Sequence, residues 1–223
     1  MTNLEDALVA VEAGADAVGF VFYEKSPRCV TVETAREIVK KLPDSVEKVG
    51  VFVGESIEGA VETGRRARFD SLQMYLLTYR QSAKDSDLHA RATGTDGFRT
   101  YLALPVRVFL GEGSKNLAGF AQERPPGLFD TIFLDSGNSQ QPGGTGRTFD
   151  WREAAGAVRD LSLHQKVVIA GGLTPGNVGE AMEILKPWGV DVASGVEARP
   201  GKKDPEKVRA FVRAVREMDQ KVS

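Results

Sequence analysis

Residues 166–178, KVVIAGGLTPGNV, lead from an apolar run into a predicted helix through two adjacent glycines. The run 166–170 predicts a strand, and the pattern at 175–185 predicts a helix whose first turn begins at Pro175. A second junction, ASGVE at 193–197, overlaps the end of another apolar run, VDVAS at 190–194. Two successive strand-to-helix units of this kind indicate an α/β fold with parallel strands.

The same alternation extends back towards the N-terminus. Five further apolar runs predict strands, at residues 17–23, 48–53, 71–77, 100–109 and 130–135. Helical patterns stand before, between and after these runs, at residues 2–13, 32–41, 56–67, 81–93, 116–122, 149–160 and 205–218. Repeated βα units predict right-handed crossovers, and their number favours a (β/α)8 TIM barrel over an open doubly wound sheet.

The organisation of the chain is that of one domain. No linker or shift in composition marks a boundary, so residues 1–223 are predicted to form a single barrel domain. The chain opens on a helix, with a capping box at Thr2-x-x-Glu5 and a stop at Gly14. No strand precedes that helix, so we expect this chain to lack the first β-strand of the barrel.

Composition excludes several classes of protein. Hydrophobic residues make up 41% and charged residues 27%, which fits neither a disordered chain nor a fibrous repeat. The net charge of −2 gives no electrostatic basis for binding nucleic acid or an anionic membrane. One Cys and two His argue against an internal disulfide and a structural zinc site. The start is polar and acidic and no apolar stretch is long enough to span a bilayer, so we expect a cytoplasmic protein.

The two glycine-rich junctions predict a phosphate site. Glycine lets the backbone approach a ligand closely, and free N–H groups at a helix start favour an anion. In barrels, the loops after the last two strands commonly form such a site. The candidate residues are Gly171, Gly172, Ser194 and Gly195. The alternative is that these glycines only relieve steric crowding at the junctions.

Asp135 is the strongest candidate for an acid or base. It ends the apolar run at 130–135, and catalytic residues of barrels lie at the carboxyl ends of strands. Partial burial there would raise the pKa of its carboxyl and suit it to protonate a substrate oxygen. The alternative is an aspartate that caps a helix or anchors a loop. Asp191 lies inside an apolar run and is expected to make structural hydrogen bonds.

Arg28 lies in the loop after the run at 17–23 and could bind a substrate carboxylate through two hydrogen bonds. The alternative is a solvated loop arginine. His89 and His164 lie in polar surroundings and are expected at the surface, and Trp151 is expected to pack on its helix.

At this point an ordered set of motifs resembles one family, phosphoribosylanthranilate isomerase, a (β/α)8 enzyme of tryptophan biosynthesis. The matching stretches together cover roughly half of the chain. They are TNLEDALVAVEAGADAVGFVFYEKSPR at 2–28, VGVFV at 49–53, FLDSGNSQQPGGTGRTFDW at 133–151, IAGGLTPGNV at 169–178 and VDVASGVEARPGKKDPEKVRAFV at 190–212. Other phosphosugar barrels fit less well, because the chain shows no half-repeat typical of the histidine-pathway isomerase.

The resemblance implies an Amadori rearrangement without metal or cofactor. N-(5′-phosphoribosyl)anthranilate, a small-molecule substrate, becomes 1-(2-carboxyphenylamino)-1-deoxyribulose 5-phosphate. The resemblance assigns the general acid to Asp135 and the contact to the anthranilate carboxylate to Arg28. It assigns the phosphate to Gly171, Gly172, Ser194 and Gly195, and further substrate contacts to Gln73 and Gly144. A monomer or homodimer is expected.

The sequence departs from the family pattern at three places. The family's first strand, a K-I-C-G motif whose cysteine is the general base, has no counterpart, and Cys29 does not align with it. The fourth-strand motif V-Q-L-H-G reads LQMYL at 72–76, and residues 77–128 match poorly. Without the base, turnover should fall by about 10²–10⁴-fold. Either the translation start lies upstream, or the chain is a relative that binds phosphosugars with little or no catalysis.

Overall fold

The computed structural model describes residues 1–75, 97–106, 110, 129–137 and 148–222. Its centre is a sheet of seven parallel strands in the order β1-β2-β3-β4-β5-β6-β7. Their bounds are β1 Ala17–Phe22, β2 Glu47–Val53, β3 Ser71–Tyr75, β4 Arg99–Pro105, β5 Thr131–Asp135, β6 Lys166–Ile169 and β7 Gly189–Val190. Spatial order follows chain order, as successive right-handed βα units require.

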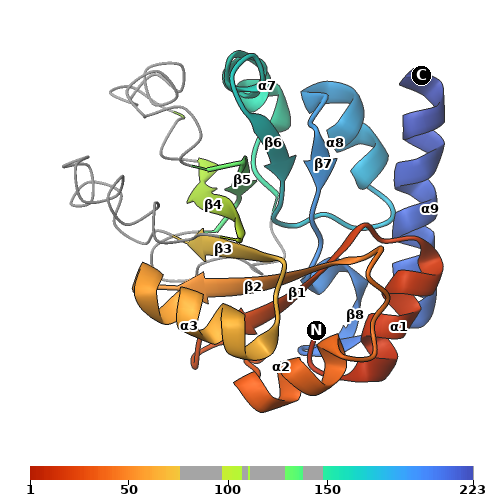
Figure 1. Cartoon of the computed structure of the whole chain (residues 1–223). Helices are drawn as coiled ribbons and strands as arrows, with labels where there is room; N and C mark the ends of the chain where they lie inside the picture. The colour runs from red at the N-terminus through yellow and green to blue at the C-terminus, as the bar shows by residue number, and fades with distance from the viewer. Residues whose placement is uncertain (76–96, 107–109, 111–128, 138–147, 223) are drawn as a thin grey trace.

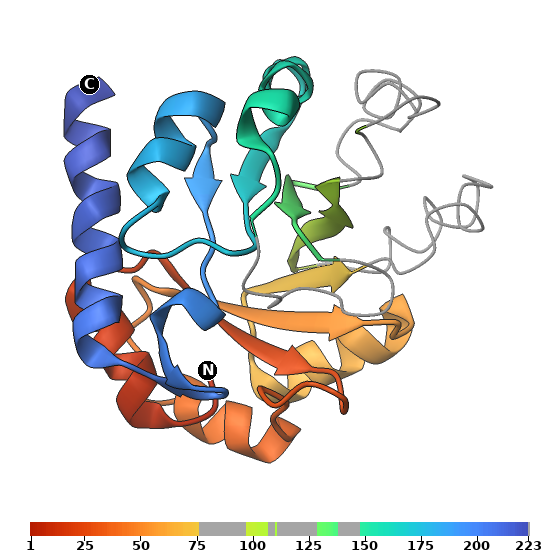
Figure 2. The ribbon, with the colours of Figure 1, turned by 180° about the vertical axis from the view of Figure 1, so that it is seen from behind.

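Helices cover the outer face of the curled sheet (Figure 1). Their bounds are α1 Leu4–Ala13, α2 Val32–Val39, α3 Ile57–Ala67, α7 Trp151–Ser162, α8 Val178–Leu185 and α9 Pro205–Val222. Neighbouring helices pack side by side, α7 on α8, α8 on α9, and α9 on α1 (Figure 2). The fold is therefore of the predicted (β/α)8-barrel class, with seven barrel strands in the described residues.

Alternation along the strands decides which side chains face the helices. Leu102, Leu104, Leu134 and Ile169 are fully buried and join the core that also holds Leu161 of α7. Their strand neighbours point to the opposite, inner face of the sheet. Asp135 and Gln73 lie on this inner face, at the end of β5 and in the middle of β3, respectively. Burial of apolar residues on the outer face thus directs the predicted site residues inwards.

Three details of the sequence prediction are wrong. The helix predicted from Pro175 begins at Val178, because the Asn177 side chain bonds to Thr174 and Gly172 and holds 174–177 as a turn. The last strand spans only Gly189–Val190, since the chain then turns into η2, the short 3-10 helix Ser194–Val196. The cap of α1 is Asn3 rather than Thr2, whose hydroxyl donates to the carbonyl of Gly201 instead.

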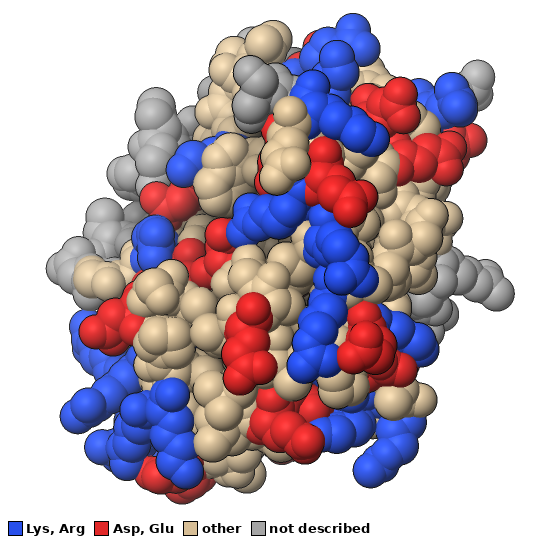
Figure 3. Space-filling model, turned by 90° about the vertical axis from the view of Figure 1, so that its right-hand side faces the viewer, with Lys and Arg blue, Asp and Glu red and all other residues tan. Residues whose placement is uncertain are grey.

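The sheet has two edges, β1 and β7, and no ladder joins them in the part of the chain that the structure describes. Beside β1 lies residue 1, whose amino group donates to the carbonyl of Gly19. A small antiparallel hairpin, β8 Glu197–Arg199 and β9 Lys202–Lys203, follows η2 on the same side (Figure 1). Among the described residues, no helix is both long and apolar enough to span a bilayer. Figure 3 shows acidic and basic side chains interspersed on one face.

Candidate active site

Asp135 ends β5, and its side chain is nearly inaccessible to solvent. Only 8% of the residue is exposed, and the backbone N–H of Gly137 donates to its Oδ1 at 2.6 Å. Burial raises the pKa of its carboxyl to about 6, against the opposing effect of that hydrogen bond. A carboxyl with such a pKa can carry a proton near neutral pH, as an acid catalyst must.

A second carboxyl, that of Asp191, lies near Asp135 and further raises the pKa of Asp135 through its negative charge. Asp191 follows β7, and part of its surface is accessible to solvent. Many protein atoms nevertheless lie close to its carboxyl group. This crowding raises the pKa of Asp191, while the ammonium group of Lys203 opposes the rise. Beyond the structural hydrogen bonds predicted for Asp191, its negative charge thus acts on the candidate acid.

Next to Asp135 runs the first glycine-rich loop. Ala170 donates its N–H to the carbonyl of Leu134, which places Gly171 directly against Ser136. A Cβ on Gly171 would lie 2.2 Å from the Ser136 Oγ, so only glycine fits. Gly171 and Gly172 both have positive φ, and their N–H groups donate no hydrogen bond within the described residues. These amides are suited to an anion beside Asp135.

The second glycine-rich loop rests on the first. A Cβ on Gly195 would lie 1.8 Å from the carbonyl oxygen of Leu173, so the two backbones touch here without a side chain between them. Ser194 and Gly195 form the start of η2. The structure thus brings the four predicted phosphate residues, Gly171, Gly172, Ser194 and Gly195, onto two loops in contact.

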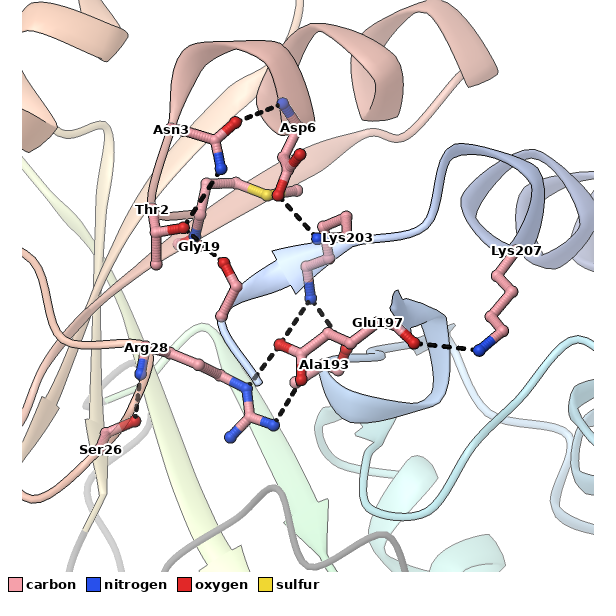
Figure 4. A network of polar contacts seen from close by, with 12 residues as sticks. Thr2, Asn3, Asp6, Gly19, Ser26, Arg28, Ala193, Glu197, Lys203 and Lys207 are labelled. Atoms are coloured by element: carbon pink, nitrogen blue, oxygen red, sulfur yellow. Dashed lines mark hydrogen bonds and ion pairs between the residues drawn. The ribbon is translucent and has the colours of Figure 1, made fainter. Parts of the chain in front are cut away.

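Arg28 lies in the loop after β1 and is ion-paired rather than solvated. Its Nε and Nη2 donate to the two carboxylate oxygens of Glu197, both at 2.8 Å (Figure 4). Lys203 Nζ lies 3.6 Å from Glu197 Oε1 and donates to the carbonyl of Ala193 at 2.8 Å. Burial lowers the pKa of Lys203, which the charges of Glu197 and Asp191 partly offset.

The other predicted residues lie apart from this group or outside the described part. Gln73 is half-buried on β3, and Cys29 is exposed. His164 is exposed, and Trp151 packs against the core, both as predicted. Gly144 and His89 lie outside the described residues. No group of three His, Cys, Asp or Glu side chains suited to a metal occurs within the described ranges.

The raised pKa of Asp135 predicts a pH-dependent stability. Because its folded pKa of about 6 exceeds the ordinary 3.8, the folded state binds this proton more tightly than the unfolded state does. The free energy of unfolding should therefore fall by roughly 3 kcal/mol between about pH 4 and pH 6 on account of this group. Asp135→Asn, which cannot ionise, should abolish this part of the fall. Urea unfolding at pH 4 and pH 7 measures the free energy of unfolding of the unaltered protein and of Asp135→Asn. An equal fall in this free energy between the two pH values in both proteins would contradict the expectation.

Comparison with known proteins places this chain in a family. A family model described as N-(5′phosphoribosyl)anthranilate (PRA) isomerase matches residues 1–84 and 100–214. The chain belongs to the phosphoribosylanthranilate isomerase family. The matched ranges include Arg28, Asp135, both glycine-rich loops and Glu197.

Curated relatives carry the same family name. The chain is 40% identical over 217 residues to the N-(5′-phosphoribosyl)anthranilate isomerase of Pelobacter propionicus, covering 97% of this chain and 93% of that protein. It is 43% identical over 216 residues to the enzyme of Pseudomonas aeruginosa LESB58, covering 97% and 92%.

Solved phosphoribosylanthranilate isomerases have the same fold. The crystal structure from Thermotoga maritima matches with a TM-score of 0.78 and 34% identity, over 97% of this chain and 96% of that one. Another matches with a TM-score of 0.75 and 32% identity, over 97% and 95%, and holds reduced 1-(o-carboxyphenylamino)-1-deoxyribulose 5-phosphate.

Sequence reasoning missed three residues of this phosphoribosylanthranilate isomerase barrel. Asn177 holds the first loop through two hydrogen bonds, and Glu197 and Lys203 surround Arg28 with charge. A usable signal was present, because 197–204 reads EARPGKKD, a charged stretch directly after a glycine junction. What the sequence did not reveal was which cation pairs with which carboxylate.

Proposed function

We propose that this chain is an N-(5′-phosphoribosyl)anthranilate isomerase in which Asp135 is the general acid. The observation that carries the proposal is a buried carboxyl with a pKa of about 6, whose neighbour in sequence, Ser136, lies against a loop suited to bind phosphate. The substrate has an oxygen to protonate and a phosphate to bind, so one ligand would use both features.

The first step follows from the chemistry of Asp135. Its carboxyl donates a proton to the ring oxygen of the ribose, the bond from C1′ to that oxygen breaks, and the nitrogen lone pair forms a C1′=N bond. A base then removes the C2′ proton, and the resulting enolamine tautomerises to the ketone. Burial favours the first step, because it keeps Asp135 protonated at a pH where an exposed aspartate is ionised.

Binding is divided between two ends of the substrate. The amides of Gly171, Gly172 and Gly195, with Ser194, take the phosphate, and Arg28 takes the anthranilate carboxylate. Gln73, on the inner face of β3, and Gly144 complete the proposed substrate contacts. We further propose that the chain is a single-domain cytoplasmic protein. We propose that it acts as a monomer or a homodimer, since one relative, from Thermotoga maritima, is described as a dimeric enzyme from which monomers were generated.

The proposal is tested by turnover and binding together. This chain and a version extended at its N-terminus by a Lys-Ile-Cys-Gly strand are expressed in a bacterium that lacks the isomerase. We expect the extended form to restore growth without tryptophan, and both forms to bind the reduced product analogue in calorimetry.

Three outcomes are decisive. Failure of the extended form to support growth would reject the isomerase assignment. Growth with the unextended chain alone would show that the added cysteine is unnecessary. Binding of the analogue by both forms, with growth from neither, would favour the alternative, a phosphosugar-binding barrel without catalysis.

A further inference from the structure

Glu197 occupies an unusual electrostatic position at the barrel mouth. Its side chain is 5% exposed and accepts both hydrogen bonds from Arg28, whose side chain is 17% exposed. Lys203, 11% exposed, is its second cationic neighbour. Burial alone would raise the pKa of Glu197, but the Arg28 hydrogen bonds and the charge of Lys203 outweigh burial and hold the pKa below its usual range. The Glu197 carboxylate is therefore charged and fixed at neutral pH.

The backbone of Glu197 is held as firmly as its side chain. Lys207 Nζ donates to its carbonyl at 3.0 Å, and Glu197 pairs with Lys203 across the β8–β9 hairpin. On the same hairpin, a Cβ on Gly201 would lie 2.8 Å from the carbonyl oxygen of Pro27, the residue before Arg28. The hairpin thus contacts the Arg28 loop at two points, one of which is the Arg28–Glu197 pair drawn in Figure 4.

One edge of the Arg28 guanidinium stays available. Nε and Nη2 donate hydrogen bonds to Glu197, while Nη1 has no hydrogen bond or ion pair to any residue that the structure describes. A guanidinium is planar and carries five donors, so an ion pair through Nε and Nη2 leaves the Nη1–Nη2 edge able to bind a second carboxylate.

We propose that Glu197 is a positioning residue that orients this free edge of Arg28 towards the carboxylate of the substrate. The inference rests on the proposed function, because it takes Arg28 as the contact to that carboxylate. Glu197 directly follows η2, so one short segment, 194–197, carries both the proposed phosphate-binding residues Ser194 and Gly195 and the carboxylate that orients Arg28. Residues 194–197 thereby relate the position of the proposed phosphate site to the direction of the Arg28 guanidinium.

Two ligands separate positioning from a general structural role. One is the reduced product analogue, and the other is the same molecule with a phenyl group in place of the carboxyphenyl group. For Glu197→Gln we expect the Kd of the carboxylated ligand to rise about tenfold to thirtyfold, and that of the phenyl ligand to change less than twofold. Glu206→Gln, the same change in the exposed pair with Arg209, is the matched control and should alter neither Kd.

A double-mutant cycle with Arg28→Lys tests the route of the effect. If Glu197 acts through the guanidinium of Arg28, Glu197→Gln should reduce the affinity for the carboxylated ligand only slightly further once Arg28 is replaced by lysine. Equal weakening of both ligands by Glu197→Gln would mean a structural role, and no weakening would mean no role; either overturns the inference. Glu197→Asp, which keeps the charge, covers a failure of the glutamine variant to fold, and should bind the carboxylated ligand more tightly than Glu197→Ala does.

Failure of the proposed function has a different signature. If the unaltered chain binds the two ligands equally well, Arg28 does not contact the carboxylate of the ligand. The proposed role of Arg28 in substrate binding and the inference about Glu197 then fail together. If the unaltered chain prefers the carboxylated ligand and Glu197→Gln leaves that preference intact, only the inference fails.

Discussion

Replacing Asp135 by asparagine is expected to lower kcat by about 10²–10⁴-fold, the usual contribution of a general acid. Asparagine keeps the shape of the side chain and can still accept the hydrogen bond from Gly137, so the β5 terminus should stay intact. It has no proton to donate to the ribose ring oxygen. Steady-state kinetics in the chain extended by Lys-Ile-Cys-Gly measure the effect where turnover should be greatest.

Binding must be followed in parallel, because a misplaced loop would also reduce turnover. The Kd of the reduced product analogue should change less than threefold in Asp135→Asn, since general-acid catalysis acts on the transition state. Undiminished kcat would remove Asp135 from the mechanism. A rise in Kd that matches the fall in kcat/KM would point to a binding role.

Replacing Gly195 by alanine is expected to disrupt the phosphate site. The added Cβ would lie 1.8 Å from the carbonyl oxygen of Leu173 and 3.2 Å from the Cα of Thr174, and backbone cannot rotate away as a side chain can. Overpacking should cost about 1–3 kcal/mol of unfolding free energy. Separation of the two loops should weaken phosphate binding by about 10–100-fold, the loss expected for one to two charge-assisted hydrogen bonds. Titration with the reduced product analogue and thermal unfolding measure the two effects.

The matched control is Gly156→Ala on α7, where nothing lies within 4 Å of the added Cβ. Alanine favours the helix at an interior position, so this variant should be as stable as the unaltered protein or more stable by up to about 1 kcal/mol. Its affinity for the analogue should be unchanged. Equal ligand affinity in both alanine variants would rule out the proposed loop contact.

The spacing of apolar residues predicted helices and strands well where contacts between residues close in sequence decide the structure. The runs at 17–23 and 48–53 became β1 and β2, and Gly14 ended α1 in a left-handed conformation, as glycine after a helix commonly does. The predictions were wrong where a distant contact overrides the local pattern. The run VDVAS is apolar enough for a longer strand, but contact between Gly195 and Leu173 requires the chain to leave the sheet early.

The candidate site shows the same division. Strand-end position singled out Asp135, and glycines directly after predicted strands, the pair Gly171-Gly172 and the single Gly195, singled out both loops, because these signals are local in sequence. The Arg28–Glu197 ion pair joins residues 169 positions apart, so no local pattern could reveal it. Its partner, Glu197, sets the direction in which the Arg28 guanidinium points, and only the fold brings the two residues together.

The contacts of Asp6 have a consequence for the order in which the protein can be made. Its two carboxylate oxygens accept hydrogen bonds from Lys202 Nζ and Lys203 N–H, residues 196 and 197 positions away. A nascent chain therefore contains Asp6 long before either partner is synthesised, so these two hydrogen bonds form late. Contacts between residues so far apart in sequence are slow to form, and the Asp6 carboxylate lacks these two partners while the early βα units are synthesised. We therefore expect α1 to reach its final packing only after residues 202 and 203 have left the ribosome, when nearly the whole chain is available to fold.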